Sequence, residues 1–364
     1  MRDTAAGPPV RVGVVGVGYW GPKLVRGLTE LDGAELCWVA DLDPARLARV
    51  ARQHPTVRTT PDFQDLLDSD IAAVVVATPI RTHHRLAKAA LLAGKHVLVE
   101  KPLAATSAEC EDLIALAEAR GLTLMVGHTF EYNPAIRALR EIVASGEIGE
   151  VYYADLARLN LGQFQPDINV LWDLAPHDLS ILLYVLQQDP LAVSARGSAH
   201  ITPGVHDVAY LEVRFAGELR AHAHLSWLDP CKVRRVTVVG SKKMVVCNDL
   251  LELEKIRIYD KGVDRRYETD HFGDFPLTYR YGGVTIPFVP PQEPLGAQCA
   301  HFLACIRGGA RPQSDGAIGL KVVRMLEAAD CSLRNEGATE LLDLRVPGPP
   351  AGARTNGAAV RWSA

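Results

Sequence analysis

The sequence contains no long hydrophobic run and no large excess of charge of either sign. The longest unbroken apolar segment runs from Ile71 to Ala77, far short of the ~20 residues that a membrane-spanning helix needs. Lys and Arg total 39 and Asp and Glu total 43, a formal net charge of −4, which argues against binding nucleic acid by phosphate neutralisation. The residues before Val10 contain no apolar core of a secretory signal. We therefore expect a cytoplasmic protein with neither a membrane nor a nucleic-acid partner.

Cysteine pairs and metal-ligand clusters are also missing. The seven cysteines are odd in number and scattered, with no Cys-x-x-Cys pair, a pattern typical of reduced thiols. His222 and His224 share one face of a predicted strand, but no further ligand stands at matching spacing. The sequence therefore predicts no disulfide framework and no metal site.

The 364 residues are enough for two domains at roughly 150 residues each. In the first third, apolar β-branched runs alternate with helical patterns, which predicts a doubly wound parallel sheet. Later strands follow one another without helices between them, which predicts an α+β domain with an antiparallel sheet. We expect a dinucleotide-binding Rossmann domain over 8–131, an α+β substrate-binding and oligomerisation domain over 132–346, and a disordered tail over 347–364. The expected strands are 10–15, 35–40, 72–77, 96–99, 122–126, 151–159, 205–228, 232–246 and 251–259, and the expected later helices are 134–145, 173–187, 295–306 and 316–334.

A glycine-rich loop, Gly16-Val17-Gly18-Tyr19-Trp20-Gly21, follows the first predicted strand and precedes a helix. In such a loop the first glycine permits a tight turn, the second lets the backbone approach a pyrophosphate, and the third lets helix and strand pack closely. Tyr19 and Trp20 are expected to pack around this loop. The alternative is that the glycines serve only a tight turn.

Asp41 ends the second predicted strand, twenty residues after Gly21. A carboxylate at this position can accept hydrogen bonds from an adenosine ribose and repels a 2′-phosphate. It favours NAD over NADP as the cofactor, although Arg46, one turn further on, can compensate the charge. A plain capping role for Asp41 is less attractive because Asp43 already precedes Pro44 at a helix start.

Two charged residues, Glu100 and Lys101, stand at the carboxyl end of a buried predicted strand and are followed by Pro102. In an open α/β sheet this edge is where ligands bind. The Lys101 ammonium can polarise a hydroxyl or carbonyl oxygen and stabilise negative charge there. The alternative is a surface lysine paired with Glu100.

Several motifs together resemble the glucose–fructose oxidoreductase / inositol dehydrogenase (Gfo/Idh/MocA) family. They are Gly16-x-Gly18-x-x-Gly21, Thr78-Pro79 with Thr82-His83, Ala93-Gly94-Lys95-His96-Val97, Glu100-Lys101-Pro102 and Asp173-x-x-x-His177. The resemblance implies a C-terminal domain with a large open sheet, association into a homodimer or homotetramer through that sheet, and oxidation or reduction of sugars with a bound nicotinamide. It also implies cofactor contacts from Thr78, Pro79, His83, Glu100 and Lys101, and catalytic roles for Lys101, Asp173 and His177.

The motif Asp173 to His177 can also be interpreted from its residues. Pro176 is best tolerated in the first turn of a helix, so we expect the helix to begin near Asp173. His177 then lies close to a positive helix end, which would lower its pKa and keep the imidazole neutral. A neutral imidazole can accept the proton of a sugar hydroxyl as hydride leaves, with Asp173 binding a neighbouring hydroxyl and Asp178 stabilising the helix start. The alternative for His177 is a capping residue packed between domains.

Polar residues that precede this helix are candidates for substrate binding, since loops so placed often bind ligands. The segment from Arg158 through Asp178 resembles the branch of the family that acts on nucleotide-linked sugars. Arg158 is the candidate for a phosphate or carboxylate partner, with a salt bridge as the alternative. The other candidates are Tyr132, Asn133, Asn160 and Asn169.

The sequence thus predicts an NAD-dependent oxidoreductase that transfers hydride between nicotinamide and a secondary alcohol or ketone of a sugar. A nucleotide-activated sugar, reacting at C3 by family analogy, is the favoured substrate. One alternative is a dehydrogenase of free cyclitols or sugars of the inositol type. Another is a catalytically silent NAD-binding regulatory protein, although such a protein would not need all three of Lys101, Asp173 and His177.

Overall fold

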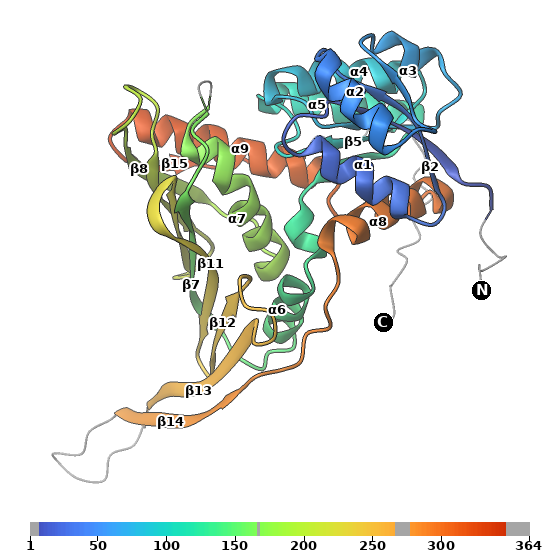
Figure 1. Ribbon diagram of the computed structural model, residues 1–364. Helices are drawn as coiled ribbons and strands as arrows, with labels where there is room; N and C mark the ends of the chain where they lie inside the picture. Colours follow the sequence, from blue (N-terminus) through green and yellow to red (C-terminus); the bar gives the residue numbers. More distant parts are fainter. Residues whose placement is uncertain (1–6, 166–167, 266–276, 347–364) are drawn as a thin grey trace, which may run out of the picture. The chain divides into compact units, whose positions relative to one another are not determined.

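The computed structural model describes residues 7–165, 168–265 and 277–346 (Figure 1). The chain divides into two compact units. The first comprises Met1–Thr129, Glu293–Arg324 and Arg345–Ala364, and the second comprises Phe130–Gln292 and Met325–Leu344. The disordered tail expected at 347–364 lies outside the described residues.

A six-stranded, wholly parallel sheet forms the centre of the first unit. Its order reverses between β1 and β4, and such a switch point is where ligands bind in open α/β sheets. The order confirms the predicted Rossmann topology, although β3 was not expected. From one edge of the sheet to the other, the strands are β3 (Arg58–Thr60), β2 (Ala34–Ala40), β1 (Val10–Val15), β4 (Ala73–Val76), β5 (His96–Glu100) and β6 (Leu124–Gly127).

Two of the helices that connect these strands begin at side-chain caps, and one of these two ends at a glycine. The Asp43 side chain accepts from the N–H groups of Ala45 and Arg46, and Thr106 accepts from Glu109. Gly121 closes its helix with a positive φ of 63°, which glycine adopts without strain. The helices are α1 (Gly21–Glu30), α2 (Pro44–Gln53), α3 (Gln64–Asp68), η1 (Ile80–Thr82), α4 (His83–Leu92) and α5 (Ser107–Arg120).

Residues 293–324 belong to the first unit, whereas the sequence placed them in the second domain. The buried Ser314 explains this: its Oγ donates to the Val126 carbonyl at 2.8 Å, and its own carbonyl accepts from the Val126 N–H at 2.8 Å. Thr129 donates to Gln298 at 2.7 Å. These bonds attach α8 (Pro294–Gly308) and the start of α9 (Gly316–Arg334) to the edge of the parallel sheet.

A nine-stranded sheet forms the second unit, and only its β7–β10 pair is parallel. This confirms the large, mostly antiparallel sheet. From one edge of the sheet to the other, its strands are β14 (Leu277–Thr285), β13 (Ile256–Arg265), β12 (Met244–Asn248), β11 (Leu228–Gly240), β7 (Val151–Leu161), β10 (Arg220–Ser226), β9 (Val208–Arg214), β8 (Ala192–Ser198) and β15 (Glu340–Leu341).

Two helices, α6 (Pro134–Ala144) and α7 (Val170–Leu186), pack against one face of this sheet (Figure 1). Helix α7 begins three residues earlier than predicted, because the Asn169 side chain caps it by accepting from the Trp172 N–H at 3.1 Å. Pro176 therefore lies inside the helix and not in its first turn. A proline at an interior position costs about 3 kcal/mol, and the complete burial of Val170 and Leu171 favours the longer helix nonetheless.

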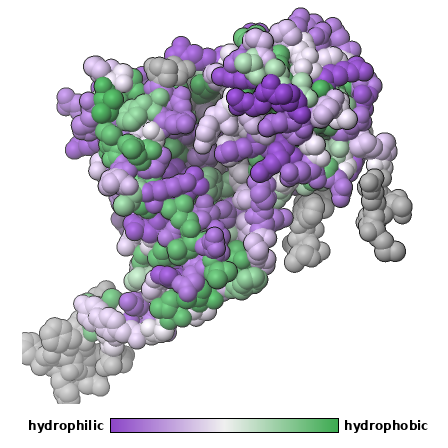
Figure 2. Space-filling view, viewed as in Figure 1, coloured by the Kyte–Doolittle hydropathy of each residue, from purple (hydrophilic) through white to green (hydrophobic). Residues whose placement is uncertain are grey.

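Hydrophobic residues gather on the surface of the second unit near the base of the β13–β14 hairpin (Figure 2). Val284, Ile286 and Phe288 are all exposed there. Among the described helices, none combines the length and apolar character needed to cross a bilayer.

Candidate functional site

The glycine loop has the geometry that a pyrophosphate requires. Gly16 has a φ of +91°, and a Cβ there would meet the Ala77 carbonyl oxygen at 2.6 Å. A Cβ on Gly21 would collide with the Gly16 carbonyl, whereas at Gly18 the nearest atom is an Arg46 nitrogen at 3.6 Å. The first and third glycines are thus needed for the turn and for close packing, and the second leaves the backbone open to a ligand. These residues fit a dinucleotide.

The Thr78-Pro79 segment lies directly against this loop, since the Thr78 methyl would contact a Cβ on Gly16. Thr82 donates to the Thr78 hydroxyl at 2.7 Å. The His83 ring is buried, with Nδ1 2.9 Å from the Pro102 carbonyl and Nε2 2.8 Å from the Thr78 carbonyl. His83 therefore links the loop after β4 to the loop after β5, and its burial lowers the pKa of the imidazole.

Asp41 binds the backbone of the same loop. One carboxylate oxygen accepts from the Val17 N–H at 2.7 Å and the other from the Asp43 N–H at 2.8 Å. The Arg46 guanidinium stands 3.7 Å from this carboxylate. The acid is thus fixed beside Gly18, where a ribose would bind, and Arg46 adjoins it as the sequence indicated.

The aromatic residues of the glycine loop have different surroundings. Tyr19 is exposed, and the Lys23 ammonium lies 5.0 Å from its ring centre and 4.1 Å from that of Trp20. The Trp20 indole is near enough to the Glu100 carboxyl to lower the pKa of that group, but the buried indole N–H has no hydrogen-bond partner among the described residues. Trp20 therefore lies between the glycine loop and the end of β5.

Glu100 is half-buried, with one carboxyl oxygen completely buried, and its carboxyl lies over Gly127, where a Cβ would approach it to 3.0 Å. Burial raises the pKa of the Glu100 carboxyl to about 7, and the adjacent Lys101 charge opposes this rise. The Lys101 N–H is 3.3 Å from the carboxyl. Lys101 itself is half-buried at the strand end that the sequence predicted.

His128, which the sequence interpretation missed, follows β6 and is completely buried. Burial and then the Lys101 charge lower the pKa of its imidazole to about 3. No hydrogen-bond partner reaches either ring nitrogen within the described ranges. The pairing of Glu100 with Gly127 in the parallel sheet places His128 beside Lys101, and this register was the signal that could have found it.

In the second unit, the buried Trp227 positions Asp173. Its indole N–H donates to the Asp173 carboxylate at 3.0 Å. The indole ring packs on Gly162, where a Cβ would lie only 2.6 Å from the ring, and Phe164 covers it with ring centres 5.4 Å apart. The polar loop before α7 therefore supports the orientation of this acid.

His177 lies one turn after Asp173 on the same face of α7, because residues four apart are neighbours on a helix. The Phe130 ring meets the imidazole edge-on, with ring centres 5.0 Å apart. Since α7 begins at Val170, His177 lies beyond the first turn to which the field of a helix end is confined. The expectation of a helix-end effect on His177 was therefore wrong.

Arg158 and Asp178 form a buried, bidentate ion pair. Nη2 donates to Oδ1 at 2.7 Å and Nε donates to Oδ2 at 3.0 Å. The side chains are 7% and 3% exposed, so the Arg158 fork is occupied by protein and corresponds to the salt-bridge alternative. Asp178 does not stabilise the helix start as predicted; it anchors α7 to β7.

Three of the polar residues expected to bind substrate are engaged within the protein. Asn133 caps α6 by accepting from Ala135 and donates to Asp249 at 2.7 Å. Tyr132 is completely buried, and Asn169 both caps α7 and donates to Asp330 at 3.0 Å. Asn160 is half-exposed on the same side of β7 as Arg158, as the twofold repeat of a strand requires.

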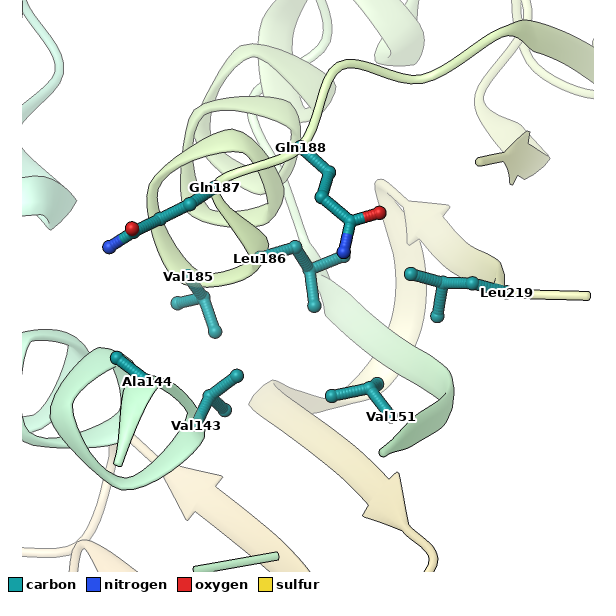
Figure 3. Close-up of a pocket in the computed structure, with 8 residues that line it drawn as sticks. All are labelled: Val143, Ala144, Val151, Val185, Leu186, Gln187, Gln188 and Leu219. Atoms are coloured by element: carbon teal, nitrogen blue, oxygen red, sulfur yellow. The ribbon is translucent and has the colours of Figure 1, made fainter. Parts of the chain in front are cut away.

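A pocket in the second unit lies away from these residues (Figure 3). Val143, Val151, Val185 and Leu186 point toward one another in it. It lies at the C-terminal end of α7, about 12 Å along the helix axis from His177 at 1.5 Å per residue. It contains no acid–base group and is not the candidate site.

No group of three or more His, Cys, Asp or Glu side chains that could hold a metal ion occurs among the described residues. His222 lies 3.5 Å from Glu212, and His224 stacks on Tyr210 with ring centres 4.4 Å apart.

Two protein families match this chain: residues 10–128 match an oxidoreductase family with an NAD-binding Rossmann fold, and residues 136–246 match the GFO/IDH/MocA C-terminal domain. The UDP-N-acetylglucosamine 3-dehydrogenase of Acidithiobacillus ferrooxidans is 28% identical over 86% of this chain and 94% of its own length. Its solved structure covers 90% of this chain and 98% of its own, with a TM-score of 0.73.

Two further relatives are also oxidoreductases. Inositol 2-dehydrogenase of Acidothermus cellulolyticus is 32% identical over 60% of this chain and 66% of its own. A putative oxidoreductase of Magnetospirillum magnetotacticum is 31% identical over 88% of this chain and 99% of its own, with a TM-score of 0.74. The chain belongs to the Gfo/Idh/MocA family of oxidoreductases and uses NAD.

Replacing Asp41 by asparagine should shift cofactor preference toward NADP. The change removes the charge that repels a 2′-phosphate and leaves the neighbouring Arg46 to attract it. We expect the ratio of the NADP to the NAD dissociation constant to fall at least about tenfold, or ~1.4 kcal/mol, as measured by calorimetry. The nearby Asp43→Asn variant, which keeps a good helix cap, should retain the wild-type ratio; an unchanged ratio in Asp41→Asn would contradict the assignment.

Replacing Glu100 by glutamine should alter how stability depends on pH. A folded pKa of about 7, above the ordinary ~4.3 of the unfolded chain, means that the folded state binds the proton more tightly. The free energy of unfolding therefore falls as pH rises between these values, by up to about 3 kcal/mol. We expect Glu100→Gln to gain stability relative to wild type between pH 5 and pH 8 in urea titrations. The exposed Glu118→Gln variant is the control, and parallel curves for Glu100→Gln and wild type would refute the prediction.

Proposed function

We propose that this oxidoreductase acts on a nucleotide-activated sugar, exchanging hydride at a secondary alcohol carbon, C3 by analogy. The arrangement of Asp173 and His177 carries the proposal: they share one face of α7, with Trp227 bonded to the acid and Phe130 packed on the imidazole. The match to UDP-N-acetylglucosamine 3-dehydrogenase over nearly its whole length supports the substrate class.

Each residue has a distinct role in the proposed reaction. NAD, when bound, accepts or supplies the hydride at its nicotinamide ring. His177 takes the hydroxyl proton during oxidation and returns it during reduction. Lys101 stabilises the negative charge that develops on the same oxygen, and Asp173 orients the sugar through a neighbouring hydroxyl.

The glycine loop and Asp41 hold the cofactor in this scheme. Gly18 leaves room for the pyrophosphate, and the start of α1 presents N–H groups to it. The His83 bridge between the Thr78 and Pro102 carbonyls keeps the Lys101 loop attached to the cofactor loop. His83 thus contributes by position, since its ring is buried.

A free cyclitol is the second candidate substrate, favoured by the relationship to inositol 2-dehydrogenase. The purified protein should be incubated with NAD and a panel of UDP-, dTDP- and GDP-sugars beside free sugars and inositols. We expect NADH formation with one or more nucleotide sugars. Turnover of free cyclitols alone would replace the proposed substrate, and no NADH formation with any member would favour a non-catalytic protein.

Lys101→Ala and His177→Ala should abolish turnover without abolishing cofactor binding. Removing a group that stabilises charge or transfers a proton typically costs about 10²–10⁴-fold in rate, so we expect kcat to fall at least about a hundredfold. The dissociation constant for NAD should change less than about threefold. Lys88→Ala, a surface lysine that pairs with Asp112, is the control; wild-type activity in either site variant would contradict its role.

A further inference from the structure

Two arginines face each other across the second sheet beside the candidate base. Arg234 of β11 is directly opposite Arg158 of β7 in an antiparallel pair. Like charges in this position repel and are destabilising. The neighbouring Val236 and Val238 are buried, so the twofold strand repeat puts Arg234 on the helix-covered face of the sheet.

The Phe130 ring joins both arginines to His177. The Arg158 and Arg234 guanidinium carbons lie 4.5 Å and 5.7 Å from its centre, and the His177 ring centre is 5.0 Å away. Arg234 and His177 are therefore both neighbours of the same aromatic ring.

The two guanidinium groups differ in what they have left to bind. Arg158 is 7% exposed and its fork is occupied by Asp178. Arg234 is 38% exposed, and its nitrogen lies 3.6 Å from the Asp249 carboxylate. Asp249 is shared, because it also accepts from Asn133 at 2.7 Å and lies 3.7 Å from the Lys255 ammonium.

The charges of this group do not cancel. Among the ion pairs of the described residues, Arg158, Arg234 and Lys255 pair with Asp178 and Asp249, which leaves one positive charge in excess at a partly buried place. Burial and then the neighbouring Arg158 charge lower the pKa of Arg234. An anionic ligand would relieve both the repulsion and the excess charge, and a guanidinium fork matches phosphate or carboxylate oxygens.

We propose that Arg234, rather than Arg158, binds an oxyanion of the substrate, a phosphoryl group of a nucleotide-activated sugar or the carboxylate of a sugar acid. This inference rests on the proposed function for the name of the ligand, but not for the presence of an oxyanion site. Arg158 supports it indirectly by holding α7 in register and by contacting the Phe130 ring, which Arg234 also approaches.

The test is calorimetric binding of UDP-N-acetylglucosamine, glucuronate and neutral myo-inositol to protein saturated with NADH, so that the glycine loop is already filled. We expect Arg234→Ala to weaken binding of one or both oxyanions about 10- to 100-fold, as loss of a charge-assisted hydrogen bond does, and to leave myo-inositol binding unchanged. Arg234→Lys should recover part of the loss. Comparing the loss of UDP-N-acetylglucosamine binding with the loss of glucuronate binding distinguishes a phosphoryl site from a carboxylate site.

Arg235→Ala is the matched control, because Arg235 is adjacent in sequence but lies on the opposite face, 3.8 Å from Asp155. Arg234→Gln, which keeps a donor for Asp249, guards against misfolding, and thermal unfolding should be compared for every variant. Equal losses in the Arg234 and Arg235 variants, no loss in any Arg234 variant, or no oxyanion binding by wild type would each overturn the proposal. Failure of the proposed reaction is distinguishable, because it would leave Arg234-dependent binding without NADH formation in the substrate panel.

Discussion

The buried ion pair between Arg158 and Asp178 is the constraint on which the arrangement of the second unit depends. It joins the middle of β7 to α7 at the residue that follows His177, with both side chains almost completely excluded from solvent. Breaking one partner of such a pair typically costs about 3–5 kcal/mol, because the other charge is left buried. The pair therefore allows α7 essentially one rotation against the sheet. That rotation places His177 against Phe130 and Asp173 against Trp227.

The parallel sheet of the first unit achieves a comparable constraint with backbone and small residues. The ends of strands β1, β4, β5 and β6 are adjacent. Each contact between the loops that follow them depends either on a specific side chain or on a glycine that has none. Gly16 admits the Thr78 methyl, and Gly127 admits the Glu100 carboxyl. His83 then ties the loops together through two carbonyl oxygens. Lys101 consequently lies in a loop whose backbone is held in place by these contacts.

Features encoded by local spacing could be predicted from the sequence. The glycine loop, the capping acid Asp43 and the strand-end position of Lys101 depend on neighbours within a few residues, and the structure confirms these placements. The sequence offered a salt bridge as one alternative for Arg158, but it could not identify Asp178 as the partner, because the two residues are 20 positions apart. The start of α7 was misplaced for a related reason: Pro176 outweighed Asn169 in a local interpretation, whereas burial of Val170 and Leu171 decides the helix. The return of residues 293–324 to the first unit similarly depends on bonds such as that of Ser314 to Val126, which link positions 188 residues apart.

The two units solve the problem of buried charge in opposite ways, and this bears on how the site functions. Around Lys101, burial raises the pKa of Glu100 to about 7 and lowers that of His128 to about 3, so Glu100 is partly protonated near neutral pH and the His128 imidazole is neutral. Around Arg158, by contrast, the charges are retained and matched by carboxylates, except for the surplus at Arg234. A cation without strong competing anions stabilises charge developing on a bound ligand more effectively than one already neutralised, because less of its field is cancelled. Arg234 is closer to that condition than Arg158, because its Asp249 partner lies 3.6 Å away and is shared with Lys255, whereas Asp178 occupies the Arg158 fork. The same physical criterion thus separates the arginine suited to act on a ligand from the one that holds the second unit together.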